Sequence, residues 1–242
     1  MGEIGFSRFI EKWIWNKLGI RYILIWFISN VFCIMSYTIV ALPENNVLKK
    51  LQSIRDYFYQ NNFRYSNKPV SDLAHISLSV ISDDIPDWFK AELTENFKWE
   101  KSFTLSDFIV HTEEHKRIFD IPEKKEKYPN WCWWFTILFP NNERLVNTSK
   151  KIISIANKYW MDETFEYAHT MAWYEKKDTN NINIHDFIAN HMNICNYIRL
   201  EKMEEAKTIF ESEFKHNSIL IDRIWIRKLD KTGDIVYEIR LK

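Results

Sequence analysis

The stretch that decides the fold is residues 73–81, LAHISLSVI, in which polar and apolar side chains alternate. In an extended chain His75, Ser77 and Ser79 fall on one side, and the apolar residues between them fall on the other. Such alternation predicts a β-strand with one face in the core and one face open to solvent. The open face of this strand therefore presents an imidazole together with hydroxyl groups.

The segments before this strand predict a second strand and a helix. Residues 36–42, SYTIVAL, are rich in β-branched side chains and are followed by Pro43, which is typical of a buried strand. Residues 46–60, NVLKKLQSIRDYFYQ, place apolar side chains at helical spacing and predict an amphipathic helix. The first half of the chain therefore has the order strand, helix, strand.

The same order is predicted further along the chain. Residues 131–139, WCWWFTILF, form a β-prone run, and residues 142–160 have apolar positions at helical spacing. Residues 164–174, TFEYAHTMAWY, are then predicted to form a strand. One face of that strand would carry Tyr167, His169, Met171 and Trp173. The two halves therefore resemble each other.

The rest of the chain completes a mixed fold. Residues 184–214 are predicted to be mostly helical, and residues 219–228 and 235–241 predict a hairpin. The whole order predicts an α+β fold of two lobes, in which antiparallel sheets line a central cleft and helices lie outside. We place this domain at residues 36–242, preceded by an N-terminal hydrophobic helix within residues 1–35.

The N-terminal hydrophobic stretch has more than one interpretation. Residues 22–42 contain no charged side chain, and roughly 20 apolar residues are enough to span a bilayer. A core strand at 36–42 would leave only residues 22–35, which is short for a span. Residues 1–35 are therefore a helix packed on the domain or on a membrane, a transmembrane anchor, or a non-native extension. Membrane contact would involve residues 13–35.

Composition limits the partners. The chain has 33 basic and 33 acidic residues, whereas a protein that binds long duplex nucleic acid by counterion release usually has a basic excess. Its four glycines form no G-x-G-x-x-G or G-K-[ST] motif, so no standard nucleotide-binding loop is predicted. Three widely spaced cysteines form no metal or disulfide pattern. They favour a cytoplasmic location, with membrane anchoring through the N-terminal helix as the alternative.

The histidines suggest a reaction. His75 and His169 lie at matching places in the two predicted halves, and two opposed imidazoles suit a phosphodiester. One can deprotonate the attacking hydroxyl or water, and the other can protonate the leaving oxygen. Ser77 shares the face of His75 and can donate a hydrogen bond to a phosphate oxygen. Tyr167 and Trp173 are candidates for stacking a nucleobase. This chemistry requires no metal and no other cofactor.

The motif resembles a known family. Residues 75–78, HISL, match the H-x-[ST]-hydrophobic motif of 2H phosphoesterases, which include RNA 2′,3′-cyclic phosphodiesterases (the 2′-5′ RNA ligase proteins) and the U6 snRNA 3′ exonuclease. Residues 37–44 resemble the first strand of that family, and residues 237–241 resemble the end of its closing hairpin. The resemblance covers residues 36–242.

The resemblance implies a metal-independent phosphodiesterase that acts on a 2′,3′-cyclic phosphate, a 2′-5′ linkage or an RNA 3′ end. His75 and His169 would be catalytic and Ser77 would bind phosphate. The partner would be a small phosphodiester, an oligonucleotide or an RNA end. Family members carry Ser or Thr where this sequence has Met171, whose thioether cannot donate a hydrogen bond. Two alternatives stay open: a catalytically weakened nucleotide- or RNA-end-binding module, and a membrane-tethered scaffold.

Overall fold

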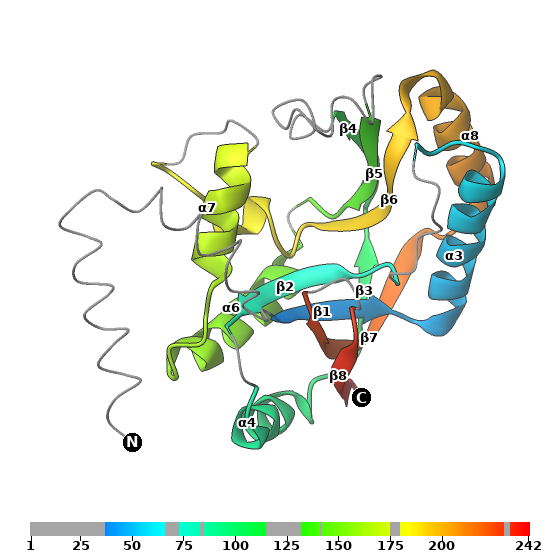
Figure 1. The fold of residues 1–242 in the computed structure, drawn as a ribbon. Helices are drawn as coiled ribbons and strands as arrows, with labels where there is room; N and C mark the ends of the chain where they lie inside the picture. Colours follow the sequence, from blue (N-terminus) through cyan, green and yellow to red (C-terminus); the bar gives the residue numbers. More distant parts are fainter. Residues whose placement is uncertain are drawn as a thin grey trace. The chain divides into compact units, whose positions relative to one another are not determined.

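A computed structural model describes residues 37–65, 73–82, 85–114, 132–140, 142–174, 180–229 and 233–242. Within these ranges, helices and strands form a mixed fold around two antiparallel sheets (Figure 1). No helix in the described part of the chain is long and apolar enough to cross a membrane. The predictions for residues 1–35, including the N-terminal helix and the domain boundary, concern residues outside these ranges and stay predictions.

Sheet A is built around its longest strand, β7 (Ser218–Lys228), which pairs with three others. Its strand order is β2-β1-β7-β3, and β8 also pairs with β7; all pairs are antiparallel. The other strands are β1 (Tyr37–Pro43), β2 (Ile76–Ile81), β3 (Phe103–Ser106) and β8 (Ile235–Arg240). The strands predicted at 36–42 and 73–81 and the closing hairpin are therefore confirmed.

Sheet B has the order β4-β5-β6, again antiparallel. Its strands are β4 (Ile109–Glu114), β5 (Cys132–Leu138) and β6 (His191–Arg199). The chain passes from sheet A to sheet B at Asp107, whose φ of 57° lies in the left-handed region that Asp tolerates better than most residues. The strand predicted at 131–139 is confirmed as β5.

The helices pack against these sheets. They are α3 (Asn45–Gln60), α4 (Asp87–Phe97), α6 (Glu143–Asn157), α7 (Thr164–Tyr174) and α8 (Met203–Glu213), with short 3-10 helices η2 (Ile184–Asp186) and η3 (Leu200–Lys202). Helices α3 and α6 are the two predicted amphipathic helices. Helix α6 begins at Asn142, whose side chain accepts a hydrogen bond from the backbone of Leu145 at 3.1 Å.

A chain of aromatic contacts joins the two halves of the core. Phe58 of α3 stacks on Phe63 at 5.1 Å and meets Phe135 of β5 edge-on at 6.1 Å. Phe135 in turn meets Phe210 of α8 at 5.1 Å. All four rings are buried. The helix of the first half therefore packs against the sheet of the second half, and one core supports both sheets.

The strand predicted at 164–174 is wrong, because these residues form helix α7. Asp162 accepts a hydrogen bond from the backbone N–H of Thr164 at 3.2 Å, which caps the start of the helix. The hydroxyl of Thr164 accepts from the backbone N–H of Val80 at 3.1 Å, which fixes that end of the helix to β2. Residues two apart on a helix do not share a face. His169 and Met171 are therefore not neighbours on one surface.

The helical prediction for residues 184–214 is confirmed only in part. It includes η2, η3 and α8, but residues 191–199 are strand β6. Met192 and Ile194 are buried, and His191 and Asn193 between them are half-buried. This alternation is that of a strand with one face in the core.

Candidate functional site

His75 lies directly before β2, at the end of sheet A where that strand begins. Its Nδ1 is 2.8 Å from the backbone carbonyl oxygen of Leu73. A carbonyl oxygen can only accept, so Nδ1 carries the hydrogen in this contact. In the neutral ring Nε2 is then the atom with the lone pair, which is the form that a general base needs.

A guanidinium group covers the imidazole of His75. Nη1 of Arg227 on β7 is 3.2 Å from Nδ1 and 3.4 Å from Nε2 of that ring. The two ring nitrogens point in different directions within the ring plane, so a nitrogen nearly equidistant from both lies over the ring face. The guanidinium of Arg227 therefore places a permanent positive charge against the ring of His75.

The register of sheet A shows what lies beneath this contact. Val40 on β1 pairs with Ser77 on β2 and with Trp225 on β7, so the three side chains form one row on one face. His75 and Arg227 flank the row on opposite sides and meet across it. Val40 is fully buried, although it lies on the same face as half-buried Ser77 and Trp225. The face therefore carries a histidine, a hydroxyl, an arginine and an indole around a covered valine.

Sheet B presents a comparable face. His191 on β6 pairs with Leu138 on β5, and Asn193 pairs with Thr136, which pairs in turn with His111 on β4. Nδ1 of His191 is 2.6 Å from the side-chain oxygen of Asn190. An amide oxygen only accepts, so the hydrogen again lies on Nδ1 and Nε2 is the basic atom of the neutral ring.

The two sheets contain the same sequence of elements. In sheet A, β1 is followed by α3 and then by β2; in sheet B, β5 is followed by α6 and, after α7 and η2, by β6. A histidine stands at the start of each second strand, His75 directly before β2 and His191 as the first residue of β6, with a polar side chain two residues later. That side chain is Ser77 in one case and Asn193 in the other, and a hydroxyl and an amide can both donate hydrogen bonds. The counterpart of His75 in this repeat is therefore His191.

A direct backbone contact links the two histidine strands. The backbone N–H of Ala189 donates to the carbonyl oxygen of Ser77 at 2.7 Å. Ala189 is two residues before His191, and Ser77 is two residues after His75. Each histidine is therefore close in sequence to this backbone contact.

His169 occupies a different setting from the one predicted. It lies on α7, half-buried, with its ring centroid 6.3 Å from that of Phe165 one turn earlier. Tyr167 packs against a small cluster of Ala168, Met171 and Phe187. The side chain of Trp173 lies outside what the structure describes. The catalytic role of His169 and the stacking roles of Tyr167 and Trp173 stay predictions.

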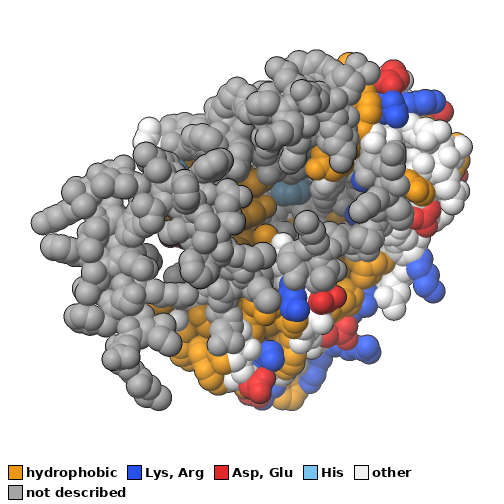
Figure 2. All heavy atoms as spheres, in the orientation of Figure 1, with side chains coloured by type: hydrophobic (Ala, Val, Ile, Leu, Met, Phe, Trp, Pro, Cys, Tyr) orange, Lys and Arg blue, Asp and Glu red, His pale blue; other side chains and the backbone are white. Residues whose placement is uncertain are grey.

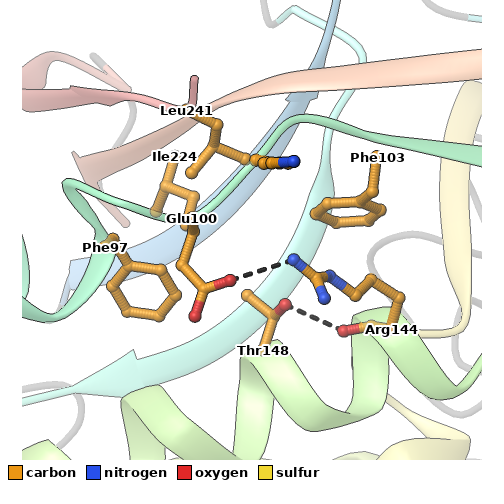
Figure 3. A pocket seen from close by; sticks show the side chains of 8 residues that line it. Phe97, Glu100, Phe103, Arg144, Thr148, Ile224 and Leu241 are labelled. Atoms are coloured by element: carbon orange, nitrogen blue, oxygen red, sulfur yellow. Dashed lines mark hydrogen bonds and ion pairs between the residues drawn. The ribbon is translucent and has the colours of Figure 1, made fainter.

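Figure 2 shows one face of the molecule, on which a histidine side chain lies in a hollow beside hydrophobic side chains. Another hollow, of about 10 Å³, is lined by Phe97, Glu100, Arg144 and Ile224 among others (Figure 3). Ile224 is next to Trp225 on β7, so its side chain points to the opposite face of sheet A from the row described above. This hollow has room for about one water molecule and is not the candidate site.

Four candidate site residues were not predicted from the sequence: His191, Asn193, Trp225 and Arg227. The first two had a visible signal, because residues 191–194, HMNI, repeat the polar and apolar alternation of residues 75–78. The other two had no such signal, because only the pairing of β7 with β1 places Trp225 and Arg227 on the same face as Ser77 and His75.

No protein-family model matches this chain, and no curated protein matches it. The chain is similar to several solved structures, two of which are the following. E. coli LigT complexed with phosphate has a TM-score of 0.41 at 10% identity, over 86% of this chain and 95% of that one. Kluyveromyces marxianus Usb1 with uridine monophosphate has a TM-score of 0.35 at 10% identity, over 86% and 98%. TM-scores this low lend no support of their own to a function.

Proposed function

We propose that this chain is a metal-independent phosphodiesterase in which His75 and His191 are the acid and base. The observation that carries the proposal is the repeat itself: each of two linked sheets has a histidine at the start of a strand, followed two residues later by a hydrogen-bond donor. In both histidines Nδ1 lies within hydrogen-bond distance of an oxygen, and we take Nε2 as the reacting nitrogen.

The reaction proceeds in line at phosphorus. Nε2 of one imidazole takes a proton from water, the water oxygen bonds to phosphorus, and the bond from phosphorus to the leaving oxygen breaks. The second imidazole, in its protonated form, gives its proton to that oxygen. We assign the base to His75, beside the permanent charge of Arg227, and the acid to His191.

The remaining groups stabilise charge on the phosphate. Ser77 and Asn193 lie two residues after their histidines and share their faces, so each can donate to a non-bridging oxygen. A 2′,3′-cyclic phosphate, a 2′-5′ linkage or an RNA 3′ end presents such a group on a small ligand. The formal charge of zero fits ligands of this size better than long duplex nucleic acid.

The assay uses purified full-length protein with 2′,3′-cyclic nucleotides, 2′-5′ oligoadenylate and an RNA oligonucleotide, all in excess EDTA. We expect wild type to hydrolyse at least one of these, and the double variant with His75→Ala and His191→Ala to be inactive on it. Equal turnover by both proteins, or none by either on any substrate, would end the proposal. Binding without turnover would instead favour the nucleotide-binding module.

A further inference from the structure

The side-chain amide of Asn190, the residue before His191, is held at both of its polar ends. Its Nδ2 donates to the backbone carbonyl oxygen of Asp186 at 2.9 Å, and its Oδ1 lies 2.6 Å from Nδ1 of His191. The oxygen and nitrogen of this amide cannot exchange places, because a flipped amide would point its oxygen at the carbonyl oxygen of Asp186. The accepting end of the amide therefore faces the imidazole.

The backbone that carries this amide is bound to both sheets. The N–H of Ala189 donates to the carbonyl oxygen of Ser77 on β2 at 2.7 Å, and the N–H of Phe139, directly after β5, donates to the carbonyl oxygen of Asn190 at 2.7 Å. Ala189 is buried and has a φ of 58°, which a residue with a Cβ adopts only where its surroundings hold it. Asn190 is therefore fixed beside His191.

The two histidines of the proposed site differ in the acceptor that faces Nδ1. For His75 the acceptor is the backbone carbonyl oxygen of Leu73, which no substitution of a side chain removes. For His191 the acceptor is the side chain of Asn190, which a single substitution removes. The hydrogen bond made by one ring nitrogen determines the state of the other. Asn190 is therefore the place where this control can be tested.

We propose that Asn190 is a positioning residue that keeps a ring hydrogen of His191 on Nδ1, so that Nε2 is the nitrogen that gives up its proton. The inference rests on the proposed function, in which the protonated ring of His191 is the acid. In that step the bond from Nε2 to its hydrogen breaks, and the proton bonds to the oxygen that leaves phosphorus. The ring becomes neutral and keeps its other hydrogen on Nδ1. Asn190 accepts from that hydrogen before and after the transfer, so the ring keeps one orientation.

The kinetic test uses full-length protein and the best substrate of the phosphodiesterase assay. Asn190→Leu keeps the size of the side chain and removes the acceptor. We expect its kcat to fall by about 10- to 100-fold, less than for loss of the whole acid, and its KM to stay within about 2-fold of wild type. Asn190→Asp keeps an oxygen that faces Nδ1 and should recover most of the rate.

The matched control is Asn183→Leu, a change of the same kind seven residues earlier. Asn183 accepts from the backbone N–H of His185 at 3.2 Å and donates to the carboxylate of Asp186 at 3.1 Å, and these contacts are not with His191. We expect the kcat of this variant to stay within about 2-fold of wild type. An equal loss of kcat in Asn183→Leu and Asn190→Leu would assign the effect to the structure of this segment and overturn the inference.

A spectroscopic test needs no substrate. Long-range 1H–15N NMR correlations show which ring nitrogen of a neutral histidine carries the hydrogen, at a pH about two units above the ordinary pKa of histidine. The spectrum of His191→Ala identifies the signals of His191. We expect the hydrogen on Nδ1 in wild type, Asn190→Asp and Asn183→Leu, and a shift toward Nε2 in Asn190→Leu.

The two tests together separate this inference from the proposed function. The inference is wrong if the hydrogen of His191 lies on Nε2 in wild type, or if wild type and Asn190→Leu have the same tautomer. Turnover that requires His191 but does not change in Asn190→Leu also removes only the inference. A tautomer that depends on Asn190, in a protein that turns over none of the substrates, keeps the positioning contact and removes the proposed phosphodiesterase.

Discussion

The strand that carries His75 and the strand that carries His191 occupy matching places in sheets A and B, but they are held in different ways. The His75 strand is supported on its open face, where Arg227 covers the imidazole. The His191 strand is supported from the core side, where buried Arg55 of α3 donates to two backbone carbonyl oxygens of β6. In sheet A the arginine contacts the side chain of the histidine, whereas in sheet B the arginine contacts the backbone of the strand that carries the histidine.

The difference follows from what lies between helix and strand in each half. Fifteen residues separate α3 from β2, whereas 33 residues, which include α7 and η2, separate α6 from β6. Strand β6 is also irregular: its pairing with β5 shifts register twice, and Tyr197 has a φ of 63°. A strand with interrupted pairing leaves carbonyl groups to satisfy, and buried arginines supply the donors. Repeated elements can therefore keep a common site while their supports diverge.

The largest expected effect distinguishes His191 from His169. We expect His191→Ala to lower kcat by about 10²–10⁴-fold, as His75→Ala does, because each removes one proton-transfer group. His169→Ala should stay within a few-fold of wild type, because α7 is not one of the two equivalent strands. Steady-state kinetics on the best substrate gives the comparison. A large loss of kcat in His169→Ala, together with a normal kcat in His191→Ala, would favour His75 and His169 as the catalytic pair. It would contradict the proposed equivalence of His75 and His191.

The next prediction concerns the donors that follow the histidines. Ser77→Ala and Asn193→Ala should each lower kcat by about 10²-fold, because each removes one hydrogen bond to the charged phosphate. Asn193→Thr should recover most of the rate, since a hydroxyl then occupies the same position as in the first half. If the kcat of Asn193→Thr is as low as that of Asn193→Ala, then positions 77 and 193 do not have the same role in binding phosphate.

The support of β6 can be tested through stability. Arg55 donates from Nε to the carbonyl oxygen of Ile194 at 2.5 Å and from Nη2 to that of Asn193 at 2.7 Å. Arg55→Met leaves both acceptors without these donors and should lower the free energy of unfolding by about 3 kcal/mol. Lys50→Met, on the same helix, removes only an exposed ion pair with Glu213 and should have a much smaller effect. Urea denaturation followed by circular dichroism measures both.

A local probe of the same support lies on β6 itself. Cys195 is buried, and burial raises the pKa of its thiol to about 11. In the native wild type it should therefore resist iodoacetamide at pH 8, because the thiolate is scarce and inaccessible. Arg55→Met should speed its alkylation, as read by mass spectrometry of the peptide that contains it. Unchanged protection in that variant would show that β6 is held by other contacts.

The smallest effect concerns a link between the halves. Glu100, after α4, accepts from Arg144 at 2.9 Å and from Lys151 at 2.8 Å, both on α6, while its backbone carbonyl accepts from Lys242 at 2.8 Å. The hydrogen bond from Lys151 is the main cause that lowers the pKa of Glu100. Its carboxylate is one-third exposed, so Glu100→Gln should cost only about 0.5–1 kcal/mol at neutral pH.

The pH dependence of this cost has a defined sign. A lowered carboxyl pKa contributes stability above the ordinary titration range of Glu, and that stability is lost as pH falls through the folded-state value. Wild type and Glu100→Gln should therefore differ at pH 7 and converge in acid, as measured by thermal unfolding at a series of pH values. A difference that persists or grows below that range would rule out the ion pairs as its source.

The sequence predicted a helix or strand correctly where its apolar residues followed one helical or strand period without interruption. Strands β1 and β2 and helix α3 were predicted because apolar spacing, Pro43 and the alternation around His75 agree with one another. Helix α7 was missed because its aromatic and β-branched residues favour a strand locally. The helix is set instead by the cap at Asp162 and by packing of Ala168 and Met171, three residues apart.

Strand β6 was missed for the opposite reason. Its asparagines have low β-propensity, and it is a strand because the edge of β5 pairs with it and Arg55 satisfies its backbone. The contact between Arg227 and His75 could not be predicted either. The two residues are distant in sequence, and only the order β2-β1-β7 brings them onto one face.

The central place of β7 also has a consequence for protein synthesis. Strand β1 is bound on one side by β7, which also pairs with β3 and β8, yet β7 is translated long after β1 and β2. Sheet A cannot close on the nascent chain until residues 218–228 have left the ribosome, and pairings this distant in sequence form slowly. The guanidinium of Arg227 on β7 reaches His75 only when this strand pairs with β1. Until residues 218–228 pair with β1, His75 therefore lacks both the guanidinium of Arg227 and the finished sheet around it.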